Sequence, residues 1–238
     1  METMIQAVGL GLLAGAAIPV GGLLACLEHI RPAWLENEIR HSVIAFGGGI
    51  LLAAVALVLV PEGVRELSAP AGIACFLAGG VLFCAIDRSM ARRGGPKGQL
   101  LAMLLDFVPE SLALGAILAS KSSVGLLLAL LIALQNLPEA FNAYRELQAA
   151  GRPRPPSRLL GAFALIALLG PLAAWLGHAL LREQPGPLAA IMLFAAGGIL
   201  YLIFEDIAPR VPLANRWAPP LGAVGGFALG MLGQYLLA

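Results

Sequence analysis

The chain has 238 residues, of which 59% are hydrophobic and 12% are charged, and its formal net charge is +1. Its mean hydropathy is +0.87. Soluble domains contain about 25% charged residues, so this composition excludes an ordinary soluble protein. The near-zero net charge gives no reason to expect a nucleic-acid partner. We expect an all-α integral membrane protein whose surroundings are the lipid bilayer.

A helix needs about 20 apolar residues to cross the hydrocarbon core of a bilayer. Eight stretches of the sequence meet this requirement, and the links between them are too short for a soluble domain. We therefore expect a single transmembrane domain, residues 1–238, with both termini on one side. The expected spans are residues 5–27, 43–61, 69–87, 99–120, 123–143, 157–181, 187–208 and 218–237.

The distribution of Lys and Arg predicts the orientation, because cytoplasmic links carry an excess of these residues. With both termini extracytoplasmic, twelve of the fifteen basic residues fall in links that face the cytoplasm. The outer links contain only Arg65, Lys121 and Arg182. We expect no cleavable signal peptide, since the N-terminus lacks a basic region. Compact loops without glycosylation acceptors favour a bacterial inner membrane.

Polar residues lie at the ends of the first two spans. Glu28 and His29 follow span one on the cytoplasmic side, where they would either line an acidic exit for a cation or simply be solvated. Glu62 follows Pro61 at the outer end of span two. It would either attract cations at an entrance or anchor the helix at the membrane interface.

Spans four and five place carboxylates where the bilayer should be. Asp106-Phe107-Val108-Pro109-Glu110-Ser111 and Gln135-Asn136-Leu137-Pro138-Glu139-Ala140 share the pattern polar-x-x-Pro-Glu-small. Residues four apart share a helix face, so the two polar side chains of each motif point the same way. Because the two spans run in opposite directions, we expect Asp106 to be level with Glu139. We expect Glu110 to be level with Gln135, closer to the midplane.

An ionisable group inside a bilayer costs at least a few kcal/mol and usually serves a function. No Lys or Arg lies at the depth of the three acids, so no basic side chain is available there to neutralise them. Three interpretations stay open: a bound divalent cation, a structural cluster of protonated acids, and a proton relay that drives another solute. Pro109 and Pro138 each free a carbonyl oxygen four residues earlier, which would add oxygen ligands for a cation.

The last spans carry fewer polar groups. Span seven ends with Glu205 and Asp206 before Pro209, near the cytoplasmic side, where the two acids would line an exit path or be solvated. Glycines recur every four residues on span eight, at Gly222, Gly226 and Gly230. Small residues at this spacing let helices approach closely in lipid, within the bundle or between two copies in a homodimer.

The chain resembles the ZIP (Zrt/Irt-like) divalent metal transporters, whose fourth and fifth helices typically carry His-Asn-x-Pro-Glu-Gly. The resemblance covers essentially the whole chain: residues 194–209 look like the family's seventh helix and residues 46–62 like its second. It implies eight spans in an inverted-repeat bundle with both termini outside. It also implies a metal site formed by Asp106, Glu110, Gln135 and Glu139. The metal is then the transported substrate, and no prosthetic group is implied.

The sequence departs from the family pattern in its ligands. Asp106 and Gln135 replace histidines, and Phe107 replaces an asparagine, whereas Asn136 is retained. The Glu-Pro pair of helix six reads Gly170-Pro171 here. This leaves one primary position, and an all-oxygen site suits Mn²⁺ or Mg²⁺ without excluding Zn²⁺. The residues left for a secondary metal position or an exit path are Asn136, Glu205, Asp206, Glu28 and His29.

The sequence thus predicts a membrane transporter that moves a divalent metal of the Zn, Mn or Fe class towards the cytoplasm. The alternative is a protein of the same fold with lost or altered metal transport. It would act as a proton-linked carrier of another solute or as a regulatory membrane subunit. An enzyme is not expected, because no Ser–His or Cys–His pair is placed for nucleophilic catalysis.

Overall fold

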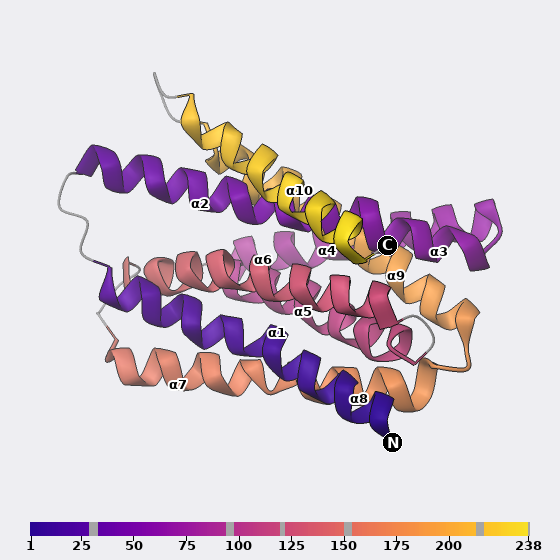
Figure 1. The fold of residues 1–238 in the computed structure, drawn as a ribbon. Helices are drawn as coiled ribbons and strands as arrows, with labels where there is room; N and C mark the ends of the chain where they lie inside the picture. The colour runs from indigo at the N-terminus through magenta and orange to yellow at the C-terminus, as the bar shows by residue number, and fades with distance from the viewer. Residues whose placement is uncertain (29–32, 94–97, 120–121, 150–153, 213–216, 238) are drawn as a thin grey trace.

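The computed structural model describes the chain except residues 29–32, 94–97, 120–121, 150–153, 213–216 and 238 (Figure 1). The described residues are almost entirely helical and contain no strand. Their α-helices are α1 (Glu2–Leu27), α2 (Ala33–Ala54), α3 (Val60–Glu66), α4 (Ala69–Arg93), α5 (Gly98–Ile117), α6 (Ser122–Ala149), α7 (Pro156–Ala167), α8 (Leu169–Leu181), α9 (Pro185–Leu202) and α10 (Ala218–Leu237). The expectation of an all-α protein is confirmed.

Within the described residues, seven helical stretches are long and apolar enough to cross a membrane. They are Glu2–Leu27, Asn37–Glu66, Ala69–Ser89, Ser123–Ala149, Pro156–Leu181, Pro185–Arg210 and Ala218–Leu237. The predicted span 99–120 corresponds to α5, a helix of 20 residues that contains Pro109. Eight spans and extracytoplasmic termini stay predictions. The start of α1 and the end of α10 lie toward the same end of the bundle (Figure 1).

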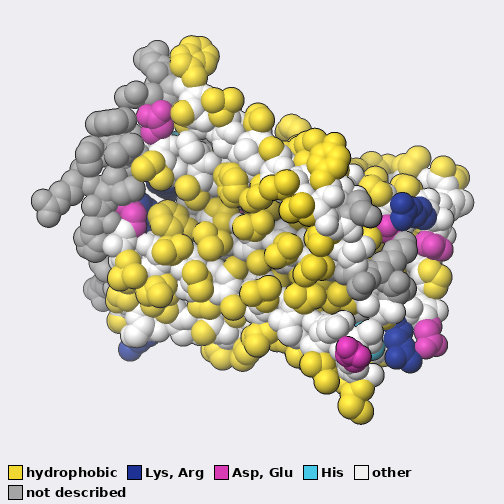
Figure 2. Space-filling model, in the orientation of Figure 1, with side chains coloured by type: hydrophobic (Ala, Val, Ile, Leu, Met, Phe, Trp, Pro, Cys, Tyr) yellow, Lys and Arg dark blue, Asp and Glu magenta, His cyan; other side chains and the backbone are white. Residues whose placement is uncertain are grey.

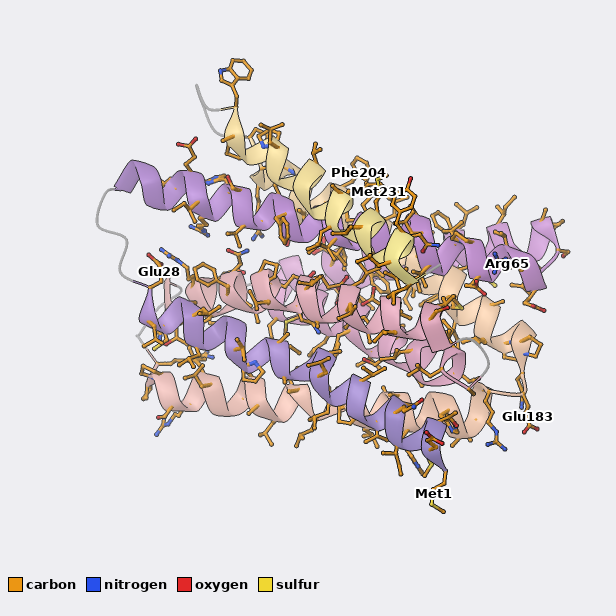
Figure 3. The ribbon with its side chains drawn as sticks, in the orientation of Figure 1. Met1, Glu28, Arg65, Glu183, Phe204 and Met231 are labelled. Atoms are coloured by element: carbon orange, nitrogen blue, oxygen red, sulfur yellow. The ribbon has the colours of Figure 1, made fainter. Side chains whose placement is uncertain are left out.

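The exposed charged side chains gather at two ends of the bundle. Glu28 lies at one end, and Met1, Arg65 and Glu183 lie at the other (Figure 3); we name these the Glu28 end and the Met1 end. Figure 2 shows hydrophobic side chains over the middle of one face and charged side chains toward its two ends. Large apolar side chains are exposed, such as Val81 on α4 at 69%. This is the surface of an integral membrane protein, and the Glu28 end is the one predicted to face the cytoplasm.

Two long helices contain a π-helical turn just before a proline. α2 runs into the turn Val55–Leu59 and then into α3, so the predicted span 43–61 extends to Glu66. α9 runs into the turn Ile203–Ile207 and then into a short 3₁₀ turn that contains Pro209. Proline cannot donate a backbone hydrogen bond, and its ring clashes with the carbonyl four residues earlier. The additional residue in each π-helical turn relieves this conflict.

The predicted span 157–181 is divided into α7 and α8 at Leu168. Pro171 lies three residues further on and has no N–H group for the carbonyl of Ala167. That carbonyl oxygen lies against Gly15 of α1, closer than a Cβ atom on Gly15 would allow. The interruption and the glycine together let α1 pack tightly on this part of the bundle.

Glycines mark the places where other helices meet. α2 packs against α10, α4 against α9, α1 against α6, and α5 against α8. Gly226 of α10 faces the carbonyl oxygen of Phe46, and Gly197 of α9 faces that of Phe76, each too closely for a side chain. The predicted packing role of the glycines is therefore confirmed within the bundle.

Candidate metal centre

The four predicted ligands lie on two inner helices that pack against each other. Asp106 and Glu110 are on α5, and Gln135 and Glu139 are on α6. Their side chains are buried: 2% of Asp106 is exposed, 0% of Glu110 and Gln135, and 9% of Glu139. Apolar residues from the core surround them. The two helices thus carry a buried polar patch in the middle of an apolar bundle.

These side chains meet in pairs at two levels. The amide nitrogen of Gln135 donates a hydrogen bond of 2.5 Å to Oε2 of Glu110. Asp106 and Glu139 line one cavity of about 30 Å³ between α2, α5, α6 and α9, and Asp206 lines the same cavity. A water molecule needs roughly 10–15 Å³ of such space, so the cavity has room for an ion or a water beside the acids. The structure brings together the same pairs that the antiparallel spans predict.

Most oxygen atoms of the patch have no hydrogen-bond donor. The buried acceptors without a partner on these two motifs are Oε1 of Glu110, Oγ of Ser111, Oε1 of Gln135, Oδ1 of Asn136, and Oε1 and Oε2 of Glu139. Leaving a buried acceptor unsatisfied costs about 1–3 kcal/mol, and more when the group is charged. A set of acceptors that lacks donors suits a cation, a proton or an ordered water.

Among the described residues, no positive side chain compensates the acids. In the part of the chain that the structure describes, Asp106, Glu110 and Glu139 form no salt bridge with Lys or Arg. The charge of Glu139 instead interacts with those of three other acids, Asp106, Glu110 and Asp206. Buried like charges repel each other and are costly to desolvate. The patch therefore needs positive charge from outside the described side chains, as bound protons or as a bound cation.

The side chains do not form a closed coordination sphere. Among the described residues, no three side chains of His, Cys, Asp or Glu have the geometry to hold a metal ion. Glu110 is turned toward Gln135, and Oδ1 of Asp106 accepts a hydrogen bond of 2.7 Å from the backbone N–H of Phe107. Gathering the three carboxylates around one ion requires their side chains to rotate.

Phe107 fills the space beside the start of α8, just after the break at Leu168. Its side chain is fully buried, and a Cβ atom on Gly170 would lie 2.7 Å from Cζ of its ring. Where the family pattern has asparagine and glutamate, this chain has an aromatic ring against a glycine. Neither residue can ligate through its side chain, and one primary position stays a prediction.

Asn136 and Glu28 connect α6 to α1. The amide nitrogen of Asn136 donates a hydrogen bond of 3.0 Å to the carbonyl oxygen of Ala14. Glu28 forms an ion pair with Arg145 near the end of α6, and His29 lies outside the described residues. The guanidinium of Arg145 also lies 5.9 Å from the centre of the Phe141 ring. Asn136 and Glu28 thus have packing and ion-pair roles, whatever part they take in cation movement.

The remaining predicted residues lie at different distances from the patch. Glu62 forms an ion pair with Arg65 and lines a cavity of about 390 Å³ between the π-helical turn Val55–Leu59, α3, α6 and α10 at the Met1 end. Asp206 forms an ion pair of 2.5 Å with Arg210 and also lines the central cavity. Glu205 is exposed. Of the predicted exit residues that the structure describes, only Asp206 lines the central cavity.

Sequence reasoning missed several polar residues near the patch. Asn142 is 3% exposed, and its Oδ1 has no partner; Oε2 of Glu146 is also buried without one. Both continue the spacing of Gln135 and Glu139 along α6, a pattern that the sequence already contains. The hydroxyl of Tyr201 donates to Asp87 at 3.3 Å across the α4–α9 contact, and only the folded structure could reveal this bond.

Comparisons of the sequence with protein-family models and with curated proteins found no match. The function is therefore argued from the residues and their geometry.

Proposed function

We propose that this protein transports a divalent metal cation through the membrane, towards the cytoplasm, by way of Asp106, Glu110, Gln135 and Glu139. The observation that carries the proposal is the group of buried acceptor oxygens on α5 and α6 that have no donor. Three of the four side chains are acids, and no described basic residue is paired with them. A cation supplies the missing charge and the missing contacts at once.

The donor atoms indicate the class of ion. Carboxylate and amide oxygens are hard ligands, which suit Mn²⁺ and Mg²⁺ and are also accepted by Zn²⁺. Pro109 and Pro138 lack the N–H groups that would otherwise engage the carbonyls of Leu105 and Leu134. These carbonyls are further oxygen ligands within one turn of the acids. We therefore expect oxygen-ligated ions of the Zn, Mn or Fe class to compete for one site.

The helix packing supports an alternating-access mechanism. The contacts of α2 with α10 and of α1 with α6 have counterparts in the contacts of α9 with α4 and of α8 with α5. These pairs match if the first three spans repeat as the last three in the same order and with inverted orientation, around α5 and α6. Transporters with inverted repeats bind their substrate near the midplane, where the repeats meet. Eight spans with both termini outside and membership of the ZIP family are part of this proposal.

The test is metal uptake by proteoliposomes that contain the purified full chain. Wild type is compared with the double variant Glu110→Gln and Glu139→Gln, using radiolabelled Zn²⁺, Mn²⁺ or Fe²⁺. The matched control is Glu183→Gln, an acid at the Met1 end whose side chain is 80% exposed. We expect the double variant to take up no more metal than protein-free liposomes, and the control to match wild type. Equal uptake by wild type and the double variant would refute the proposal.

A second function has two observations in its favour. The described acids do not form a ready metal geometry, and Phe107 against Gly170 removes two family ligands. A proton-linked carrier of another solute, or a regulatory membrane subunit, would also keep buried acids that bind protons. Equilibrium dialysis of purified wild type against Mn²⁺ and Zn²⁺ separates the two functions. If the protein transports these ions, wild type retains metal, and variants that lack the carboxylates of Glu110 and Glu139 retain less. If the alternative is right, wild type retains none.

A further inference from the structure

The polar face of α6 does not end at the central patch. Gln135, Glu139, Asn142 and Glu146 are spaced by four, three and four residues, which places them on one face of a helix. Asn142 is 3% exposed, so it is as well buried as the central acids. The series runs from the patch toward the Glu28 end, because Arg145 near the end of α6 is paired with Glu28.

The two outer members have the same hydrogen-bond deficit as the central acids. Oδ1 of Asn142 and Oε2 of Glu146 are buried and have no donor. A buried acceptor without a partner costs about 1–3 kcal/mol. A chain that only needed to fill this space could do so with an apolar side chain. The deficit therefore indicates a ligand that approaches from the side of the acceptors.

The other polar residues in this part of α6 are partnered. Nε2 of Gln148 lies 3.3 Å from the hydroxyl of Tyr144, and the ring of Tyr144 packs edge-to-face against Phe163 of α7. Tyr144 lies about 200° around the helix from Asn142, since each residue advances roughly 100°. In this part of α6, the side toward α1 and α7 is thus satisfied, and the unsatisfied oxygens of Asn142 and Glu146 lie on the opposite side.

That opposite side faces the central cavity. Pro138 of α6 lies 3.1 Å from the position that a Cβ atom on Gly47 of α2 would take, and Glu139 lines the cavity shared with α5. Asn142 follows Pro138 by four residues and Glu139 by three. Its position on the helix is therefore between the residue that faces α2 and the residue that faces the cavity.

The spacing suits a transfer of one ion along the helix. At a rise of 1.5 Å per residue, Asn142 lies about 4.5 Å beyond Glu139, and Glu146 lies about 6 Å beyond Asn142. Oxygen ligands bind divalent ions at about 2.0–2.6 Å. An ion between two neighbouring members can therefore contact both. The ion need not lose one set of oxygen ligands before it gains the next.

We propose that Asn142 and Glu146 form a second binding station for a partly hydrated divalent cation, and that the cation leaves the central site along this face of α6. The inference rests on the proposed transport function. It assigns release to α6, whereas the sequence had indicated Glu205 and Asp206 on span seven. The oxygen ligands and the partial exposure of Glu146 favour an ion that keeps some of its water.

The test uses the full-length protein in three variants. Asn142→Leu with Glu146→Ala removes both ligands, and Gln148→Ala is the control near the same end of α6. Asn142→Asp adds a carboxylate of the same size and serves as a gain-of-ligand variant. Binding of Mn²⁺ is followed by electron paramagnetic resonance, and uptake is measured in proteoliposomes. Monodisperse elution and an unchanged Tm identify variants that fold.

We expect wild type to bind Mn²⁺ at a tight central site and at a weaker second site. Loss of Asn142 and Glu146 should abolish the weaker site and reduce uptake by about 10-fold, within the range for lost metal-supporting groups, while the central site is retained. Asn142→Asp should tighten the second site by about 10-fold, which a misfolded protein could not do.

Two outcomes would overturn the inference, and they are distinguishable. Unchanged binding and uptake in both station variants, with uptake abolished by Glu110→Gln and Glu139→Gln, would leave the proposed transport intact and refute the second station. Absence of uptake and Mn²⁺ binding in wild type would refute the proposed function and the station together.

Discussion

Replacing Glu139 by glutamine is expected to stabilise the metal-free protein while it weakens metal binding. Both carboxylate oxygens of Glu139 are buried without a donor, and its charge interacts with those of Asp106, Glu110 and Asp206. Glutamine has the same shape, removes the charge, and brings an NH₂ group into the cavity that Asp106 also lines. A residue kept for ligand binding at the expense of stability should behave in this way.

The change in the free energy of unfolding follows from the number of buried acceptors that lack a donor. Two unsatisfied buried acceptors cost about 1–3 kcal/mol each, and glutamine keeps only one acceptor. We therefore expect the free energy of unfolding to rise by about 2 kcal/mol, or about 4–8 °C in Tm for a chain of this length. Metal acts in the opposite sense: at 100 times its Kd it stabilises wild type by about 2.7 kcal/mol, and it should stabilise the variant less.

Thermal unfolding in detergent measures both effects. A thiol-reactive dye reports unfolding through Cys26, Cys75 and Cys84, which are free and half-buried. Each protein is heated in EDTA and in Mn²⁺, with Glu183→Gln as the control for loss of an exposed acid. A variant that is less stable than wild type in EDTA, and that gains as much from Mn²⁺ as wild type does, would contradict the argument. The reasoning about unpartnered acceptors would then fail.

Two further results are expected. Gly197→Val should lower Tm and broaden elution, because the new side chain would meet the carbonyl of Phe76, and overpacking costs about 1–3 kcal/mol. The control is Gly161→Ala, since Gly161 has open space around it. Equal Tm values for the two variants would contradict the close α4–α9 contact. Metal binding by wild type should weaken as pH falls, because protons compete for carboxylate ligands. Dialysis against Mn²⁺ at a series of pH values measures this, and binding that is independent of pH would exclude carboxylates as ligands.

Much of the fold follows from simple properties of the chain. Long apolar runs must become helices in lipid, since no other structure satisfies the backbone within one segment. Depth then follows from the helix rise, so the pairing of Glu110 with Gln135 could be predicted by counting residues along two antiparallel spans. Span six was expected as one continuous span, 157–181. Its break at Leu168 was not predicted, because it depends on how closely α1 approaches at Gly15.

Other features required the folded structure. Glu28 was interpreted as a solvated or ion-path residue, and its partner Arg145 lies 117 residues away in sequence. Span five was expected to end at residue 143, but α6 continues to Ala149. Glu146 was therefore counted in a link, although its spacing from Glu139 and Asn142 was visible. The stretch with Arg145 and Glu146 looks like a polar turn at the membrane interface when only the sequence is known. Its burial against other helices depends on tertiary packing.

The contacts of α6 are distributed unevenly around the helix, and this distribution bears on how a cation could move. Toward α1, Asn136 is bonded to the carbonyl of Ala14 and Arg145 is paired with Glu28, so two specific contacts about 14 Å apart along the helix hold the pair together. Toward α5, Gln135 meets Glu110, and the other polar atoms of that face are unpartnered. Separating α6 from α1 would break bonds at both levels. Separating it from α5 would break one and expose oxygens that already need ligands, so the proposed transport places the cation path between α5 and α6.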